Sequence, residues 1–220
     1  MKTIALIAQK GGSGKTTLAL SLAVAAEAAG QTTMIVDLDP QASACKWGDR
    51  RQADAPIIID AQPPRLPNAL SKAAQAGVDL VIVDTPARIE QAAAEAARAA
   101  DLVIIPTRPS IHDLETLQTS LDLIKGRAKS PPVVVLNAVP PQGGRREQAM
   151  QAIRSMGVAA CPVFLGHRVA YEYAAQLGQS AAEYEPDGKA AAEITALYAS
   201  MCQLIDVSTQ RCADKEITYA

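Results

Sequence analysis

The chain has 220 residues and a formal net charge of −2, and hydrophobic residues make up 49% of it. This length suits one α/β domain, and the near-neutral charge gives no overall sign of a nucleic-acid-binding protein. The longest apolar runs have the length of strands, far below the roughly 20 residues of a membrane span. Residues 1–8 lead directly into a glycine-rich loop, which leaves no room for a signal peptide. We therefore expect a cytoplasmic protein without a membrane partner.

Strand-like and helix-like segments alternate along the chain. The predicted strands are 3–8, 32–36, 57–59, 80–83, 102–105, 133–136 and 158–163, and the predicted helices are 15–29, 66–75, 90–99, 113–125, 146–156 and 189–204. The strands lack period-two alternation, which is typical of strands buried on both faces. This order predicts an α/β fold with one doubly wound, mostly parallel sheet and helices on both faces. We place the domain at 1–205 and a polar tail, whose composition favours partial disorder, at 206–220.

The most informative segment, residues 9–17, reads QKGGSGKTT. It follows the first predicted strand and opens the first predicted helix, which is the setting of a phosphate-binding loop. Gln9 replaces the first glycine of the usual GxxxxGK(S/T) pattern, but the remaining glycines still let backbone N–H groups close around phosphate. Lys15 is expected to reach the β- and γ-phosphates of ATP, and Thr16 to supply a hydroxyl ligand to Mg²⁺. The predicted nucleotide-binding residues are Lys10, Gly11, Gly12, Ser13, Gly14, Lys15, Thr16 and Thr17.

A second lysine, Lys10, stands at the entrance of the loop. With it the loop resembles the deviant Walker A box, KGGxGK(S/T), of the ParA/MinD family. The resemblance implies an ATPase that forms a homodimer around ATP. It also implies that Lys10 reaches the phosphates of the partner subunit, as an arginine finger does. Lys10 and Lys15 are therefore catalytic candidates.

Two further strands end in acidic residues, and the carboxyl ends of parallel strands are where such sheets bind ligands. Residues 37–41 read DLDPQ and resemble the DxDPQ switch of the same family. The resemblance implies that Asp39 positions or activates the attacking water and that Asp37 supports the Mg²⁺ site. Asp84 follows the apolar run 80–83, which is Walker B geometry for holding Mg²⁺ directly or through water. The predicted metal-site residues are Thr16, Asp37 and Asp84.

Asn137 follows the predicted strand 133–136. The resemblance implies that its amide contacts adenine, although asparagine also favours turns for purely structural reasons. Residues 105–114 resemble a proline-rich segment that lies at a subunit interface in small ParA proteins. By mechanism alone this segment is a rigid link with Ser110 as a helix N-cap, so His112 is interpreted as a helix-start residue.

Residues 166–171 and 183–194 resemble the C-terminal third of plasmid-partition ParA proteins, and no helix-turn-helix extension precedes the loop. The matching class is the short ParA, which implies non-specific DNA binding by the ATP-bound dimer and a nucleoid-associated location. Such binding depends on cations that contact phosphate. An alternative is that the arginines are only solvated helix residues. The candidate DNA contacts are Arg145, Arg146, Arg154, Arg168 and Lys189.

The resulting hypothesis is a partition or positioning ATPase whose slow hydrolysis is stimulated by a partner protein. Its cargo would be a plasmid, a chromosome or a protein assembly. One alternative is a MinD-like regulator that cycles on a membrane, which needs an amphipathic basic C-terminal helix that 206–220 does not present. Another is a metabolic enzyme of the same fold, which needs cluster-bridging cysteines or a substrate pocket.

Overall fold

The computed structural model describes residues 1–205, so the predicted tail at 206–220 lies outside the described residues. Within them the strands form one sheet in the order β3-β2-β4-β1-β5-β6-β7, and every neighbouring pair is parallel. The predicted doubly wound sheet is therefore confirmed. The strands are β1 Lys2–Leu6, β2 Thr33–Asp37, β3 Ile57–Asp60, β4 Leu80–Asp84, β5 Leu102–Thr107, β6 Val133–Leu136 and β7 Ala159–Ala160.

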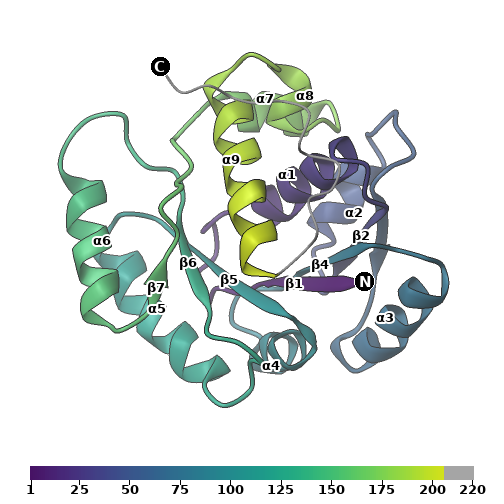
Figure 1. Cartoon of the computed structure of the whole chain (residues 1–220), viewed down its shortest axis with the longest axis horizontal. Helices are drawn as coiled ribbons and strands as arrows, with labels where there is room; N and C mark the ends of the chain where they lie inside the picture. The colour runs from purple at the N-terminus through teal and green to yellow at the C-terminus, as the bar shows by residue number, and fades with distance from the viewer. Residues whose placement is uncertain (206–220) are drawn as a thin grey trace.

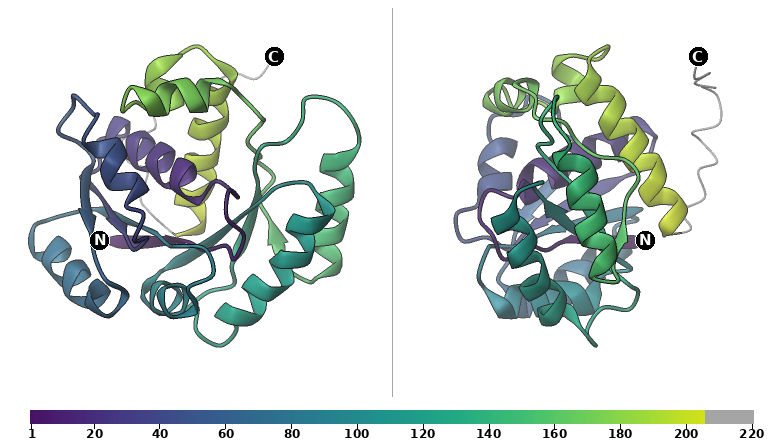
Figure 2. Two further views of the ribbon diagram at one scale, coloured as in Figure 1. Left: turned by 180° about the vertical axis from the view of Figure 1, so that it is seen from behind. Right: turned by 90° about the vertical axis from the view of Figure 1, so that its left-hand side faces the viewer.

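Helices cover both faces of this sheet (Figures 1 and 2). Helices α1, α2 and α9 contribute to the core on one face, and α3 to α6 contribute to the core on the other. The helices are α1 Lys15–Ala28, α2 Ser43–Gly48, α3 Leu66–Gln75, α4 Glu90–Ala99, α5 Ile111–Ile124, α6 Arg145–Ser155, α7 Ala170–Gln176, α8 Ala181–Tyr184 and α9 Lys189–Leu204, with a short 3₁₀ turn η1 at Pro63–Arg65.

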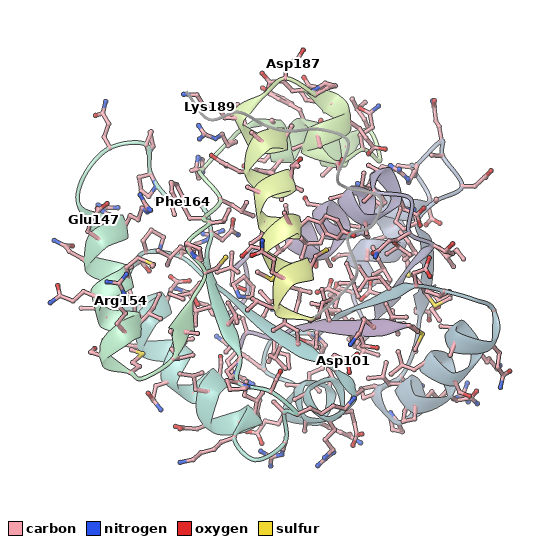
Figure 3. All side chains as sticks on the ribbon, in the orientation of Figure 1. Asp101, Glu147, Arg154, Phe164, Asp187 and Lys189 are labelled. Atoms are coloured by element: carbon pink, nitrogen blue, oxygen red, sulfur yellow. The ribbon has the colours of Figure 1, made fainter. Side chains whose placement is uncertain are left out.

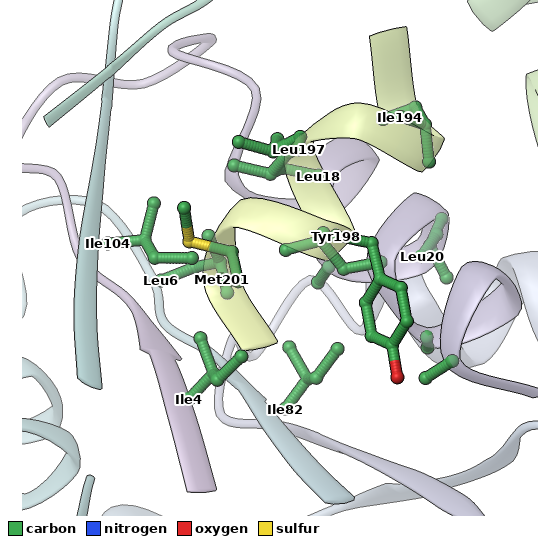
Figure 4. Close-up of a cluster of buried hydrophobic side chains, with 14 of the residues drawn as sticks. Ile4, Leu6, Leu18, Leu20, Ile82, Ile104, Ile194, Leu197, Tyr198 and Met201 are labelled. Carbon is green, nitrogen blue, oxygen red and sulfur yellow. The ribbon is translucent and has the colours of Figure 1, made fainter. Parts of the chain in front are cut away.

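Two aliphatic cores explain why the strands showed no polar alternation. Along β1, Ile4 and Leu6 face the core under α1 and α9, whereas Ala5 faces the core under α3 to α6. Successive side chains of a strand point to opposite faces, so a strand covered on both sides must be apolar throughout. Figure 4 shows the first core, a cluster that includes Ile4 and Leu6 of β1 and Leu197 and Met201 of α9.

The outer elements differ from the predictions. β3 was expected to be buried on both faces, but it pairs only with β2 and leaves Ile57 42% exposed, because it is an edge strand. The last strand was predicted at 158–163 and is reduced to 159–160. Helices α2, α7 and α8 were missed, because each is too short to show a helical period. α2 stands in a segment for which no helix or strand was predicted, and its Trp47 is fully buried.

We expect Gly178→Ala to destabilise the domain more than Gly77→Ala does. Both glycines have positive φ, which costs an L-residue about 1–2 kcal/mol. A β-carbon on Gly178 would lie 2.5 Å from the backbone nitrogen of Arg51, whereas one on Gly77 has nothing within 4 Å. Overpacking adds about 1–3 kcal/mol more at Gly178. Urea unfolding of both variants measures the difference. Equal midpoints would show that the 175–183 segment is not held tightly against Arg51.

Candidate nucleotide site

The carboxyl ends of β1, β2 and β4 meet at one edge of the sheet. The strand register places Leu6 and Asp37 on either side of Asp84. The predicted phosphate loop joins β1 to α1 above this edge. Its backbone has positive φ at Gly12 and Gly14, as the sequence pattern requires of glycine. The sheet therefore brings the loop and the acidic residues together.

Lys15, the first residue of α1, is buried under the phosphate loop. Its side chain is 7% exposed, and its Nζ donates a hydrogen bond of 3.2 Å to the carbonyl oxygen of Ala8. Burial lowers the pKa of Lys15, and the nearby carboxylates of Asp84 and Asp39 partly oppose this. A buried ammonium at the start of a helix attracts anions strongly, so the position fits its predicted contact with phosphate.

Thr16 and Asp84 form a pair of oxygen donors beside Lys15. The Thr16 hydroxyl donates a 2.6 Å hydrogen bond to Oδ2 of Asp84. Oδ1 of Asp84 is buried and has no hydrogen-bond partner among the described residues. Burial raises the pKa of Asp84 to about 7, against the lowering effect of the Thr16 hydrogen bond. Hard oxygen donors with an orphaned buried oxygen fit Mg²⁺, which would give Asp84 the partner it lacks.

Asp37 is held by backbone rather than left open. Its Oδ1 accepts from the N–H of Asp39 and its Oδ2 from the N–H of Ala44, both at 2.9 Å. Burial raises the pKa of Asp37, and these hydrogen bonds oppose the rise. Asp37 thereby fastens the start of α2 to the end of β2. Its role in supporting the metal site stays a prediction. Asp37 would support the site from the position next to Asp84 in the sheet.

Asp39 is half-buried at the turn that follows β2. Its Oδ1 accepts a 2.9 Å hydrogen bond from the N–H of Gln41, and its charge is close enough to oppose the fall in the pKa of Lys15. The carboxylate therefore lies on the same side of the sheet as the loop. Its role in positioning water stays a prediction.

Lys10 forms an ion pair within its own chain. Its Nζ lies 2.6 Å from Oδ2 of Asp113, and the Lys10 side chain is 37% exposed while that of Asp113 is 4% exposed. The Ser110 hydroxyl donates to the same carboxylate oxygen and also accepts from the N–H of Asp113. Ser110 is thus the N-cap of α5, as predicted. The helix begins at Ile111, two residues before the predicted start at 113, so His112 is a helix-start residue, as predicted.

Asn137 braces the phosphate loop. Its Nδ2 donates a 2.8 Å hydrogen bond to the carbonyl oxygen of Ser13, and its Oδ1 accepts from the N–H of Ala138 at 2.8 Å. Both ends of the amide already have partners in the protein. The predicted contact with adenine stays a prediction, and the contact that the structure provides is with the loop itself.

The candidate DNA contacts lie on three parts of the fold, with three arginines on α6, Arg168 before α7 and Lys189 at the start of α9. Arg146 lies over the ring of Phe164 at 4.3 Å, and Arg168 is paired with Glu193 at 2.5 Å. Figure 3 shows Arg154 on α6, far from Lys189 at the start of α9. Of the five candidates, the exposed cations without an ion pair among the described residues are Arg145, Arg154 and Lys189.

Sequence reasoning missed three features, two beside this site and one at the opposite, amino-terminal edge of the sheet, before β6 and β7. Asp113 holds Lys10, which no residue spacing indicates. Arg108 is exposed beside the loop, and a β-carbon on Gly12 would lie 3.8 Å from its Nη2. The basic loop after α5, with Lys125 and Lys129, lines a hollow of about 380 Å³ together with Met156 at the end of α6. The three basic residues within 125–129 were the sequence signal that could have indicated this third feature.

The comparisons with known proteins agree with this geometry. The family described as CobQ/CobB/MinD/ParA nucleotide binding domain matches residues 4–177. A protein of Gloeobacter kilaueensis named "Maintenance of carboxysome distribution protein A" is 34% identical over 207 residues, which cover 93% of this chain and 94% of that protein.

Solved structures share the fold at lower identity. The ATP complex of a Cyanothece McdA variant matches with a TM-score of 0.70 and 18% identity, over 100% of this chain and 99% of that one. The Mg-ADP complex of the septum site-determining protein MinD from Pyrococcus horikoshii matches with a TM-score of 0.69 and 21% identity, over 92% of this chain and 96% of that one. Both confirm the predicted fold.

We expect Gly14→Ala to abolish tight nucleotide binding. An added β-carbon would lie 1.9 Å from Nδ2 of Asn137 at a φ of +97°, so the loop or its brace must move. Gly77→Ala is the matched control, because Gly77 also has positive φ, has nothing within 4 Å of its β-carbon and lies outside the predicted phosphate loop. Binding of a fluorescent ATP analogue should weaken at least about tenfold for Gly14→Ala, or ~1.4 kcal/mol. Equal affinities of the two variants would contradict the bracing role of Asn137.

Proposed function

Because the chain belongs to the CobQ/CobB/MinD/ParA family of nucleotide-binding domains and is an ATPase domain of that kind, we propose that it is a ParA-type positioning ATPase. ATP and Mg²⁺ occupy the site described above and drive formation of a homodimer. The dimer binds DNA non-specifically in the cytoplasm and remains there until a partner protein stimulates hydrolysis.

The observation that carries this proposal is the position of Lys10. The site already has one lysine, Lys15, buried beneath the loop, whereas Lys10 lies at its mouth and is paired with Asp113. Asp113 and phosphate compete for the same ammonium group. Since Asp113 keeps the Ser110 hydroxyl as a partner, Lys10 can leave it without stranding a buried carboxylate. Lys10 is thus available to a second subunit.

The other residues of the site have separate tasks in the proposed cycle. Lys15 would neutralise the charge of the phosphates, and Thr16 and Asp84 would hold Mg²⁺. The bound Mg²⁺ would neutralise charge that develops on the transferred phosphoryl group. Asp39 orients the attacking water, and Asp37 keeps Asp39 in register through its hydrogen bond to the Asp39 N–H.

The relatives bear on the cargo. The Gloeobacter relative, and a second one from Halothiobacillus neapolitanus that is 28% identical, are both named for carboxysome distribution. This favours a large protein assembly as the cargo of this chain, ahead of a plasmid or a chromosome. Partition of DNA is the second candidate, on the resemblance of the C-terminal third to plasmid-partition proteins.

Membrane cycling of the MinD kind needs an amphipathic basic C-terminal helix, which the sequence of residues 206–220 does not present. Among residues 1–205, no helix combines the length and the apolar character that crossing a bilayer requires. The exposed arginines of α6 instead provide cations for phosphate contacts, together with the basic loop at 125–129.

We expect Lys10→Ala to retain ATP binding by the monomer and to lose ATP-dependent dimerisation. Lys15→Ala should lose both, because Lys15 serves its own nucleotide. Lys72→Ala, which removes an exposed lysine of α3, is the matched control. Sedimentation with ATP and Mg²⁺ measures the dimer, and nucleotide titration measures binding. A Lys10→Ala protein that dimerises like the control would overturn the proposed role in trans.

Co-sedimentation with duplex DNA tests the proposed function. The Asp39→Ala variant, which should bind ATP without hydrolysing it, is expected to stay on DNA with ATP and to leave it with ADP. Combining it with Arg145→Gln and Arg154→Gln should weaken binding and reduce the salt dependence by about 0.9 per lost phosphate contact. Lys46→Gln with Lys72→Gln removes the same charge elsewhere as the control. DNA binding that ignores the nucleotide would contradict the proposal.

A further inference from the structure

Helices α7 and α8 expose an apolar surface that no part of the described chain covers. Val169, Tyr173 and Leu177 are 62%, 54% and 55% exposed, and their spacing places them along one side of α7. Tyr184 of α8 is 43% exposed, and its ring lies 6.4 Å from that of Tyr173. We name these four residues the α7–α8 patch. Clustered exposed apolar side chains mark interaction sites, whereas scattered ones do not.

The opposite side of the same helices is anchored. Ala170 and Ala174 of α7 and Ala181 of α8 are buried, and Ala170 and Ala181 pack with Ala190 at the start of α9. Figure 1 shows α7 and α8 side by side next to the beginning of α9. The patch is therefore the outward face of a fixed element rather than part of a loose loop.

The patch continues into a hollow. A cavity of about 250 Å³ lies between residues 51–53 and residues 177–179, with Leu177 and Glu183 in its lining. An apolar residue at the rim of such a hollow offers a place where a side chain from another protein could insert.

Acidic side chains outnumber basic ones around the patch, where the exposed cations are Arg50, which donates to the carbonyl oxygen of Ala175, and Lys189, which follows the segment. Residues 169–188 contain Glu172, Glu183, Glu185 and Asp187 and no lysine or arginine. Arg51 pairs with Glu183, and the flanking Arg168 pairs with Glu193. The other three acids make no ion pair with the described residues and are exposed; Figure 3 shows Asp187 at the outer edge.

This charge selects among the possible occupants. DNA and anionic lipid surfaces are repelled by an acidic patch, and so is a second copy of the same patch. An amphipathic segment with lysine or arginine beside apolar residues satisfies both the apolar surface and the acids.

The patch is joined to the nucleotide site through α2. Asp37 accepts from the N–H of Ala44 at the start of this helix. At its other end the indole of Trp47 donates a 3.1 Å hydrogen bond to the carbonyl oxygen of Gln179. Trp47 is fully buried, so a shift of α2 must displace the segment that it contacts.

Arginines after α2 strengthen this connection. Arg51 donates to the carbonyl oxygen of Gly178 at 3.0 Å and to both oxygens of Glu183 at 3.0 and 2.7 Å. Its guanidinium also lies 4.8 Å from the ring centre of Trp47. Arg50 donates to the carbonyl oxygen of Ala175 at 3.2 Å. The two sites are thus linked by a short series of direct contacts.

We propose that the α7–α8 patch is the docking surface for a basic amphipathic segment of the partner protein, and that α2 couples its occupancy to the Asp37–Asp39 turn. The assignment of the docking surface rests on the exposure, charge and contacts described above. The identification of its occupant with the hydrolysis-stimulating partner rests on the proposed function.

A synthetic amphipathic helix of leucine and lysine is the probe, and its leucine–glutamate counterpart is the control peptide. Trp47 is the chain's one tryptophan, and it contacts Gln179 and Arg51 next to the patch, so its fluorescence reports changes there. The leucine–lysine peptide should bind and change this emission. Tyr173→Ser with Leu177→Ser should weaken binding at least about tenfold. Ile89→Ser with Leu204→Ser, which removes exposed apolar side chains elsewhere, should bind like the unmodified protein.

The charge requirement has its own test. Glu172→Lys with Glu185→Lys should reverse the preference in favour of the leucine–glutamate peptide. Equal affinity of the patch variant and the unmodified protein would overturn the docking surface. So would binding of duplex DNA or of anionic-lipid vesicles, each added without the peptide, that the Tyr173→Ser with Leu177→Ser variant loses.

Coupling is measured by repeating the titration with ATP and Mg²⁺. Nucleotide should change the peptide affinity several-fold in the unmodified protein, and linkage requires an equal effect of the peptide on nucleotide affinity. Glu183→Gln, which breaks the pair with Arg51, should remove most of this difference. An undiminished nucleotide effect in Glu183→Gln would refute the coupling through α2.

The two proposals fail separately. Peptide binding is measured without nucleotide, so an unmodified protein that binds the peptide but never dimerises with ATP refutes only the proposed function. An unmodified protein that dimerises and binds DNA with ATP, but binds the peptide no better than the patch variant does, refutes only the docking surface.

Discussion

The structure depends on burying charged groups at the carboxyl edge of the sheet. Lys15, Asp37 and Asp84 are almost fully inaccessible to solvent, although charged groups are costly to bury without partners. Lys15 is offset by Asp84 and Asp39, and Asp37 by backbone N–H groups. Asp84 keeps one oxygen without a partner. This unsatisfied oxygen and the shifted pKa values of Lys15 and Asp84 mark a site adapted to a charged ligand.

The same edge also carries a second lysine, Lys10, which we propose acts on a second subunit. Lys10 is held by Asp113 of α5 at the mouth of the loop, while Lys15 is committed beneath it. In the proposed function, Lys15 serves the nucleotide of its own subunit and Lys10 exchanges Asp113 for the nucleotide of a second subunit. From Asp37 the contacts run through α2 to Trp47 and Arg51, and from there to α7 and α8. The candidate nucleotide site and the α7–α8 patch are connected by packing and hydrogen bonds within one domain.

Local patterns predicted the elements that carry strong local signals. Apolar runs such as 80–83 and 133–136 marked the central strands, because burial on both faces leaves no room for polar residues. The edge strand β3 was misjudged, since the same apolar composition, as at Ile57, occurs where one side has no neighbour. The helices α2, α7 and α8 are held by Trp47, Arg51 and buried alanines rather than by their own periodicity.

The sequence by itself determined the glycine-rich loop, the acidic strand ends and the alternation of the longer strands and helices, because these follow from glycine conformations, apolar runs and residue spacing. Only the tertiary structure decided that Lys10 pairs with Asp113 and that Asn137 hydrogen-bonds to Ser13. It also decided that the segment carrying the α7–α8 patch contacts Trp47 of α2. Those contacts join residues about a hundred positions apart or more. Such pairs are brought together by packing of the sheet and its helices, which no local pattern specifies.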